Sequence, residues 1–106
     1  MRAPLALLFA AAVAAGAAGC AGQIPPPMDA DALRAQERWP GTTVAELTQG
    51  RSLYIDHCSG CHSLYRPASQ PAREWAAIVT EMADRAKLDT DRSHAVIRYL
   101  TAMATR

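Results

Sequence analysis

The residues whose types and spacing could do chemistry lie in one short stretch, YIDHCSGCHSLY, at positions 54–65. Cys58 and Cys61 are three positions apart, and His62 directly follows the second thiol. Residues three apart in a helix lie about one turn apart, so both thiols can face the same partner. Two thiols and an imidazole in this pattern suit four kinds of site: covalent haem attachment, thiol–disulfide exchange, structural zinc or a plain disulfide.

The order C-x-x-C-H favours haem attachment, because two thiols add to two vinyl groups at one porphyrin edge and the next residue turns an imidazole toward the iron. The other three readings stay open as alternatives. A thioredoxin-type motif needs a strand-to-helix setting, which a helical pattern does not provide. A zinc site would need four ligands from Cys58, Cys61 and His62 or His94, with no second C-x-x-C in the sequence. A disulfide would leave His62 without a role.

The first element that must position the motif is a helix beginning at Thr43. Thr43 and Glu46 have the spacing of a capping box, which satisfies backbone N–H groups at a helix start. One stripe then recurs at helical spacing and reaches the motif: Leu47, Gly50, Tyr54, Cys58 and Cys61. Gly50 inside a helix is unfavourable by about 1 kcal/mol relative to Ala, so we expect another helix to cross closely there.

Two further helices are predicted after the motif, and no stretch alternates convincingly as a strand. The second helix runs from Pro71 to about Ala86, and Pro suits a first helical turn. Its apolar face carries Trp75, Ile78, Val79, Met82, Ala83 and Ala86. The third helix begins at Asp89 or Thr90, and its buried stripe is Val96, Tyr99, Leu100 and Met103. The fold class is therefore all-α, and three short helices need something else to fill their interior.

Residues 1–19 differ from the rest, with one Arg, a mild apolar run and then small residues, which is typical of an export signal rather than a membrane span. The end of this segment, Ala17 to Cys20, resembles the lipobox of bacterial lipoproteins, although Leu is commonest where Ala17 stands. The resemblance implies that Cys20 is lipidated, which accounts for the odd thiol of three. Ala21 after Cys20 implies an outer-membrane anchor, and cleavage without lipidation remains the alternative.

Residues 20–42 are predicted to be a linker between the lipid and the domain. This stretch holds four of the seven prolines, and the run Pro25 to Pro27 should be extended. A short helix over 29–39 is expected within it, ended by Pro40 and Gly41. The formal net charge is only +1, and basic and acidic residues are interspersed, so no nucleic-acid partner is expected.

Residues 43–106 resemble a small class I c-type cytochrome domain with one haem. The match is carried by GRSLYIDHCSGCHSLYRP, residues 50–67, and by AVIRYL, residues 95–100. In that family a Gly on the helix before the motif packs against an aromatic residue on the last helix, and Gly50 and Tyr99 occupy those places. The resemblance implies a small helical bundle around one covalent haem c.

The resemblance also implies roles for individual residues. Cys58 and Cys61 would form the thioether bonds, His62 would be the proximal iron ligand, and the carbonyl of Pro67 would accept a hydrogen bond from the other nitrogen of His62. Many relatives carry an axial Met in a loop just before the last helix, and this sequence departs from them because it has no Met between Ala83 and Val96. Small haem domains with a W-x-x-x-V-x-x-M stretch place the axial Met on the helix before it, and Met82 has that position. Met82 is therefore the expected distal ligand, with packing as its alternative role.

Other possible ligands have weaker positions. His94 lies near the start of the last helix, off its apolar stripe, and is expected to be solvated. His57 directly precedes Cys58 and is too close in the chain to reach the opposite face of a porphyrin. Met103 is expected in the core, and Met28 in the linker.

The function expected from these residues is one-electron transfer without catalysis, in a monohaem cytochrome on a lipid tether at the periplasmic membrane surface. A redox protein would be its partner. Two alternatives come from other classes: a five-coordinate haem peroxidase or sensor, and a thiol–disulfide oxidoreductase that uses Cys58 and Cys61.

Overall fold

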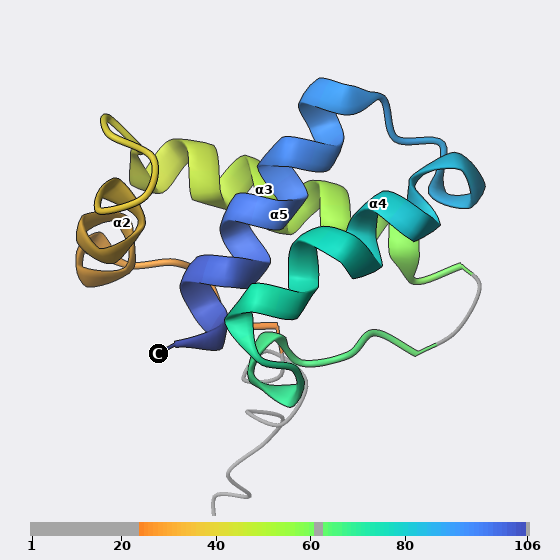
Figure 1. Cartoon of the computed structure of the whole chain (residues 1–106), viewed down its shortest axis with the longest axis horizontal. Coiled ribbons are helices and arrows are strands. Elements are labelled where there is room, and N and C mark those ends of the chain that lie inside the picture. Colours follow the sequence, from red (N-terminus) through yellow and green to blue (C-terminus); the bar gives the residue numbers. More distant parts are fainter. Residues whose placement is uncertain (1–23, 61–62, 106) are drawn as a thin grey trace, which may run out of the picture.

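The computed structural model describes residues 24–60 and 63–105, and within them every regular element is helical. The order is α2 (Asp29–Gln36), α3 (Val44–Cys58), the 3-10 turns η1 (Pro67–Ser69) and η2 (Ala72–Glu74), α4 (Trp75–Ala86) and α5 (Thr90–Ala104) (Figure 1). The predicted all-α fold class is confirmed. The predicted signal segment 1–19 and the residues Cys20, Cys61 and His62 lie outside the described residues.

The helix α3 begins as the sequence predicts. The Glu46 N–H donates to Thr43 Oγ1 at 3.1 Å, and the Thr43 N–H donates to Glu46 Oε2 at 3.2 Å. This reciprocal pair satisfies two donors that have no partner inside the helix. The helix then continues for 15 residues to Cys58, which it presents at its C-terminal end.

The helix α4 begins later than predicted. Pro71 has an extended backbone, with φ −57° and ψ 140°, and the 3-10 turn η2 separates it from the first α-helical residue, Trp75. The end at Ala86 is confirmed. There Lys87 adopts the left-handed conformation with φ 56°, and the N–H groups of Lys87 and Leu88 donate to the carbonyls of Asp84 and Ala83. This is a Schellman-type ending, and it directs Leu88 into the interior.

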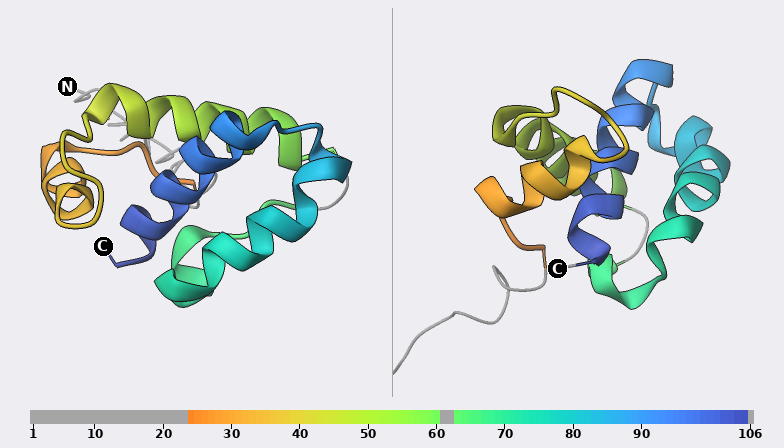
Figure 2. Two further views of the ribbon diagram at one scale, coloured as in Figure 1. Left: turned by 45° about the horizontal axis from the view of Figure 1, so that its top comes forward. Right: turned by 60° about the vertical axis from the view of Figure 1, so that its left-hand side comes forward.

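The helix α5 is the centre of the fold. Asp89 caps it by accepting a hydrogen bond from the Arg92 N–H at 2.8 Å. Its predicted stripe is confirmed, because Val96, Tyr99, Leu100 and Met103 are all buried. It contacts α2, α3, α4 and both 3-10 turns, and Figure 2 shows it passing between α3 and α4. Direct contact between α3 and α4 is sparse by comparison.

Residues 24–42, part of the stretch expected to be a linker, pack onto the domain. Pro25 to Pro27 lie outside any helix, and Ile24 before them is buried in the main hydrophobic cluster. The Arg51 Nε–H donates to the Ile24 carbonyl at 2.8 Å, and the Tyr99 hydroxyl donates to the Pro25 carbonyl at 2.6 Å. These two side chains satisfy backbone carbonyls that have no partner inside a helix, and they hold this segment against α3 and α5.

The helix α2 completes a second, smaller hydrophobic cluster. It ends at Gln36, three residues before the predicted end, and a hydrogen-bonded turn from the Trp39 N–H to the Ala35 carbonyl follows. Asp31 is buried, accepts from the Met28 N–H and pairs with Arg34, which also donates to the Ala102 carbonyl at 3.2 Å. The members of the cluster come from α2, α3 and α5: Ala32, Ala35, Leu47 and Ala102.

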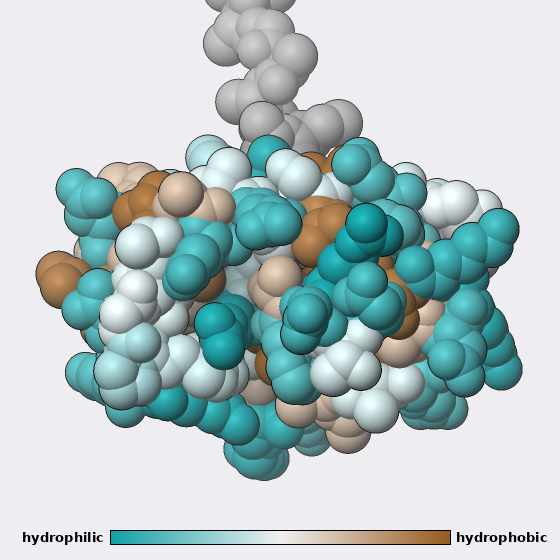
Figure 3. Space-filling model, turned by 90° about the horizontal axis from the view of Figure 1, so that it is seen from above, coloured by the Kyte–Doolittle hydropathy of each residue, from teal (hydrophilic) through white to brown (hydrophobic). Residues whose placement is uncertain are grey.

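The surface carries charges of both signs among scattered apolar groups. On the face in Figure 3, hydrophobic side chains lie in small groups between hydrophilic ones. Within residues 24–60 and 63–105, helices long and apolar enough to cross a bilayer are absent.

Gly50 is where α3 and α5 approach most closely, and this generates the first prediction. An Ala side chain at position 50 would place its Cβ 2.2 Å from the Ala95 carbonyl oxygen and 2.9 Å from Tyr99 Cβ. Because the obstructing groups belong to the backbone and to a Cβ, they cannot rotate away. We expect Gly50→Ala to lower the free energy of unfolding by about 3 kcal/mol, measured by thermal or denaturant unfolding.

The matched control is Ser52→Ala on the exposed side of the same helix, which should leave stability within about 0.5 kcal/mol of wild type. Equal stability of Gly50→Ala and the control would contradict the close crossing.

Candidate functional site

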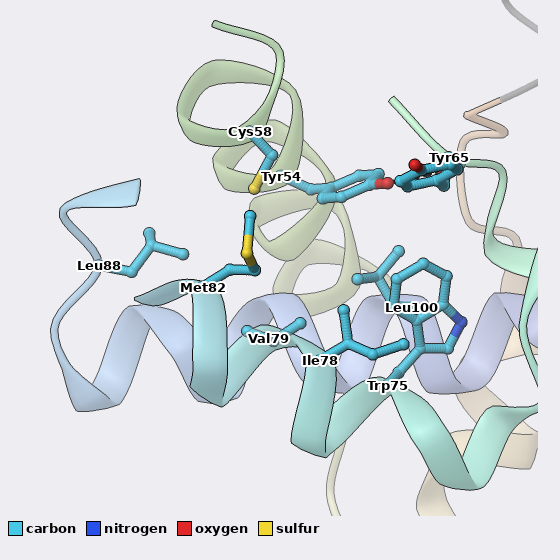
Figure 4. Close-up of a pocket in the computed structure, with 9 residues that line it drawn as sticks. All are labelled: Tyr54, Cys58, Tyr65, Trp75, Ile78, Val79, Met82, Leu88 and Leu100. Carbon is cyan, nitrogen blue, oxygen red and sulfur yellow. Dashed lines mark hydrogen bonds between the residues drawn. The ribbon is translucent and has the colours of Figure 1, made fainter. Parts of the chain in front are cut away.

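A largely apolar cavity of about 290 Å³ opens between α3, α4 and α5. Figure 4 shows the side chains around it. The helices contribute most of its walls: Tyr54 and Cys58 from α3, Trp75, Ile78, Val79 and Met82 from α4, and Leu100 from α5. Two residues outside the helices, Tyr65 and Leu88, complete the lining. The cavity therefore lies where the two helices α3 and α4 diverge on either side of α5.

The α3 wall brings a thiol and a phenol to the cavity. Cys58 is half-buried, and Figure 4 shows its sulfur pointing toward Met82 across the space. Tyr54 is buried one turn earlier, and its hydroxyl donates to the Tyr65 carbonyl at 2.6 Å. Burial, and then the neighbouring Cys58, raise the pKa of Tyr54 well above its usual value. Tyr54 is thus a neutral donor whose proton is already engaged.

The α4 wall is the predicted apolar face. Trp75 and Val79 are buried, and Ile78 and Met82 are half-buried, all at spacings that share one side of a helix. Figure 4 shows the Met82 thioether entering the cavity from α4, facing the α3 wall. The two sulfur-bearing side chains of the predicted site that the structure describes, Cys58 and Met82, therefore meet in one cavity.

The loop before α4 is fixed by Trp75. Its Nε1–H donates to the buried Pro67 carbonyl at 2.9 Å, and its ring meets the Tyr54 ring edge-on, with centroids 6.4 Å apart. Pro67 is the residue predicted to accept from His62. A carbonyl oxygen has two lone pairs, so the bond from Trp75 leaves one position for a second donor. The indole is an additional partner of Pro67, and no pattern in the sequence predicts it.

The other histidines lie outside this cavity. His94 is exposed, as predicted, and borders polar grooves beside α5. His57 is half-buried, and its Nδ1 lies 2.8 Å from the Ala86 carbonyl oxygen at the end of α4. No local pattern predicts that contact, because it joins residues 29 positions apart.

The residues present fit a porphyrin better than a bare metal ion. Two thiols and a following imidazole are the donor set for attachment, the cavity beside Cys58 is apolar, and a thioether enters it from the opposite wall. Clusters of three or more His, Cys, Asp or Glu side chains that could hold a metal ion are absent from the described part of the chain. The α/β setting of a thioredoxin-type thiol pair is missing there too, because the described elements are all helical.

Comparison with known proteins gives one match. Residues 54–106, half of the chain, match the family described as Dihaem cytochrome c. Curated proteins and solved structures give no match. The matched region begins at the cavity residue Tyr54, spans the C-x-x-C-H motif, and includes α4 and α5. The resemblance to c-type cytochromes is thereby confirmed, and the chain belongs to the dihaem cytochrome c family.

Proposed function

We propose that this protein is a one-electron carrier in which one haem c is held at Cys58 and Cys61. The observation that carries the proposal is the apolar cavity that opens beside Cys58, at the end of the helix leading into the C-x-x-C-H motif. A porphyrin is a large apolar plate, and burying it between α3 and α4 would supply the packing that these helices do not give each other.

The proposal of one haem rests on the motif count, although the family is described as dihaem. The sequence holds one C-x-x-C-H, and the third cysteine, Cys20, stands far from any second motif. Each attachment adds two thiol S–H bonds across two vinyl groups, so a second haem bound in the same way would need two more thiols. This chain therefore provides the attachment chemistry for one.

We assign His62 as proximal and Met82 as distal iron ligand. Bound haem supplies a centre that gains or loses one electron, and Met ligation favours a higher potential than a second His. The position of Met82 in the cavity, opposite Cys58, supports this role (Figure 4). Pro67 would hold the His62 ring through its carbonyl, which Trp75 already keeps in place.

The lining of the cavity favours electron transfer over catalysis. A peroxidase or sensor with an open iron position needs a polar group aimed at the bound small molecule. The α4 wall offers apolar groups and a thioether, and the side-chain donors of Tyr54 and Trp75 are both engaged with backbone carbonyls. A thiol–disulfide oxidoreductase would leave the cavity and His62 without a purpose.

We propose the cellular location of the protein from its N-terminal sequence. Cleavage before Cys20 and lipidation of its thiol would anchor the protein to a periplasmic membrane surface, with the outer membrane favoured. Residues 24–28 then connect the anchor to α2 while packed on the domain, so the tether proper is short. The partner would be a redox protein, and the balanced charge supports neither nucleic-acid binding nor strong electrostatic attraction.

The proposal predicts that haem is covalently attached to the protein. Protein exported in a host that attaches haem should give a haem-stained band on a denaturing gel, with one haem per chain by haem assay. Cys58→Ala combined with Cys61→Ala should abolish the band, because no thiol remains at the motif.

The matched control is Cys20→Ala, which should keep the haem band and lose membrane association. A colourless but folded wild-type protein would refute the proposal, and two haems per chain would refute the single-haem assignment.

The ligand assignment makes a separate prediction. Met82→Ala should eliminate the weak far-red sulfur-to-iron absorption band and lower the reduction potential, since the thioether no longer stabilises reduced iron. Met103→Leu is the control, because Met103 is buried in α5 away from the cavity lining and should keep the band. A wild-type spectrum for Met82→Ala would remove Met82 from the ligand set.

A further inference from the structure

The end of α3 and the end of α4 are joined by a hydrogen bond from a side chain with no part in the proposed site. His57 Nδ1 lies 2.8 Å from the Ala86 carbonyl oxygen. A carbonyl can only accept, so Nδ1 carries the proton and donates it. His57 is half-buried, which reduces competition from water for this bond.

The acceptor is one of the carbonyls that a helix end leaves without an internal partner. Within the last turn of α4, the carbonyls of Ala83 and Asp84 accept from the N–H groups of Leu88 and Lys87. The Ala86 carbonyl accepts instead from α3. The imidazole therefore completes the ending of α4 with a donor from another helix.

The two ends of this bond sit next to the two sulfur groups of the cavity. His57 directly precedes Cys58, and Ala86 is four residues after Met82, about one helical turn along α4. Because α3 and α4 contact each other sparsely where the cavity separates them, a direct polar bond between their ends strongly constrains their spacing.

We propose that His57 is a positioning residue for the distal iron ligand. By holding the C-terminal end of α4 to the end of α3, it fixes the distance over which Met82 must reach toward a haem attached at Cys58. The inference rests on the proposed ligation by Met82. A helix transmits the constraint, because residues one turn apart in it cannot move independently.

The experiment measures how firmly Met82 is held, using added imidazole as a competitor for its position on the iron of the purified haem protein. His57→Leu removes the donor at similar bulk. Losing a hydrogen bond of ordinary strength should make imidazole bind about five-fold more tightly. When the variant is heated, its far-red band should weaken at a lower temperature than the band of the wild-type protein.

Two further variants separate positioning from bulk. In His57→Asn the amide nitrogen is as many bonds from the backbone as Nδ1, so it can donate to the Ala86 carbonyl, and imidazole affinity should return close to wild type. In His57→Gln the amide lies one methylene further out, and it should behave like His57→Leu. His57→Gln also serves if His57→Leu yields no folded protein.

A variant that lowers only the overall stability of the protein provides the control. Thr43→Ala removes the N-terminal cap of α3, far along the helix from the cavity, and lowers overall stability without touching the bond. Its imidazole affinity should match wild type. An equal shift in Thr43→Ala, or wild-type affinity in both His57→Leu and His57→Gln, would overturn the role of His57.

The same titration distinguishes this failure from failure of the proposed function. If Met82→Ala binds imidazole more tightly and loses the far-red band while the His57 variants behave as wild type, only the inference about His57 fails. If Met82→Ala itself behaves as wild type, the ligand assignment fails and the inference falls with it.

Discussion

The close crossing of α3 and α5 at Gly50 is the constraint on which the rest of the fold depends. A hydrogen atom in place of a side chain lets the α3 backbone reach the Ala95 carbonyl and the Tyr99 Cβ. With α5 that near, its buried stripe is shared between α3 on one side and α4 on the other. The two outer helices therefore pack on α5 rather than on each other, and the space left between them is the cavity that Cys58 and Met82 enter.

The two sides of the α3–α5 pair are filled in different ways. On the side away from the cavity, Ala32 and Ala35 of α2 pack against Leu47 and Ala102, where small residues permit close approach without any added group. On the cavity side, aromatic and aliphatic side chains surround a space that protein atoms leave open. One face of the crossing is thus complete within the polypeptide, while the other is complementary to a large apolar ligand.

The elements that the sequence predicts well are those fixed by local chemistry. The Thr43 capping box, the Asp89 cap and the apolar face of α4 each depend on residues within a few positions of one another. The packing of Ile24 and Pro25 on the domain is not predicted, because it depends on donors from Arg51 and Tyr99 that are distant in the chain. A Pro-rich composition predicts extended backbone, and it does not reveal whether that backbone finds partners. The motif likewise predicts that Cys58 is an attachment residue, but the opposing position of Met82 follows only from how α4 packs on α5.

The left-handed turn at Lys87 shows how the end of α4 serves the cavity. A lysine in this conformation is less favourable than a glycine would be, and it is retained where two backbone hydrogen bonds close the helix and Leu88 is buried. The turn brings Leu88 into the cavity wall and leaves the Ala86 carbonyl facing α3, where His57 donates to it. Three features of one helix end therefore act on the same space: the chain reversal, the apolar wall and the hydrogen bond to α3. A change in any of them would alter how Met82 approaches the opposite wall.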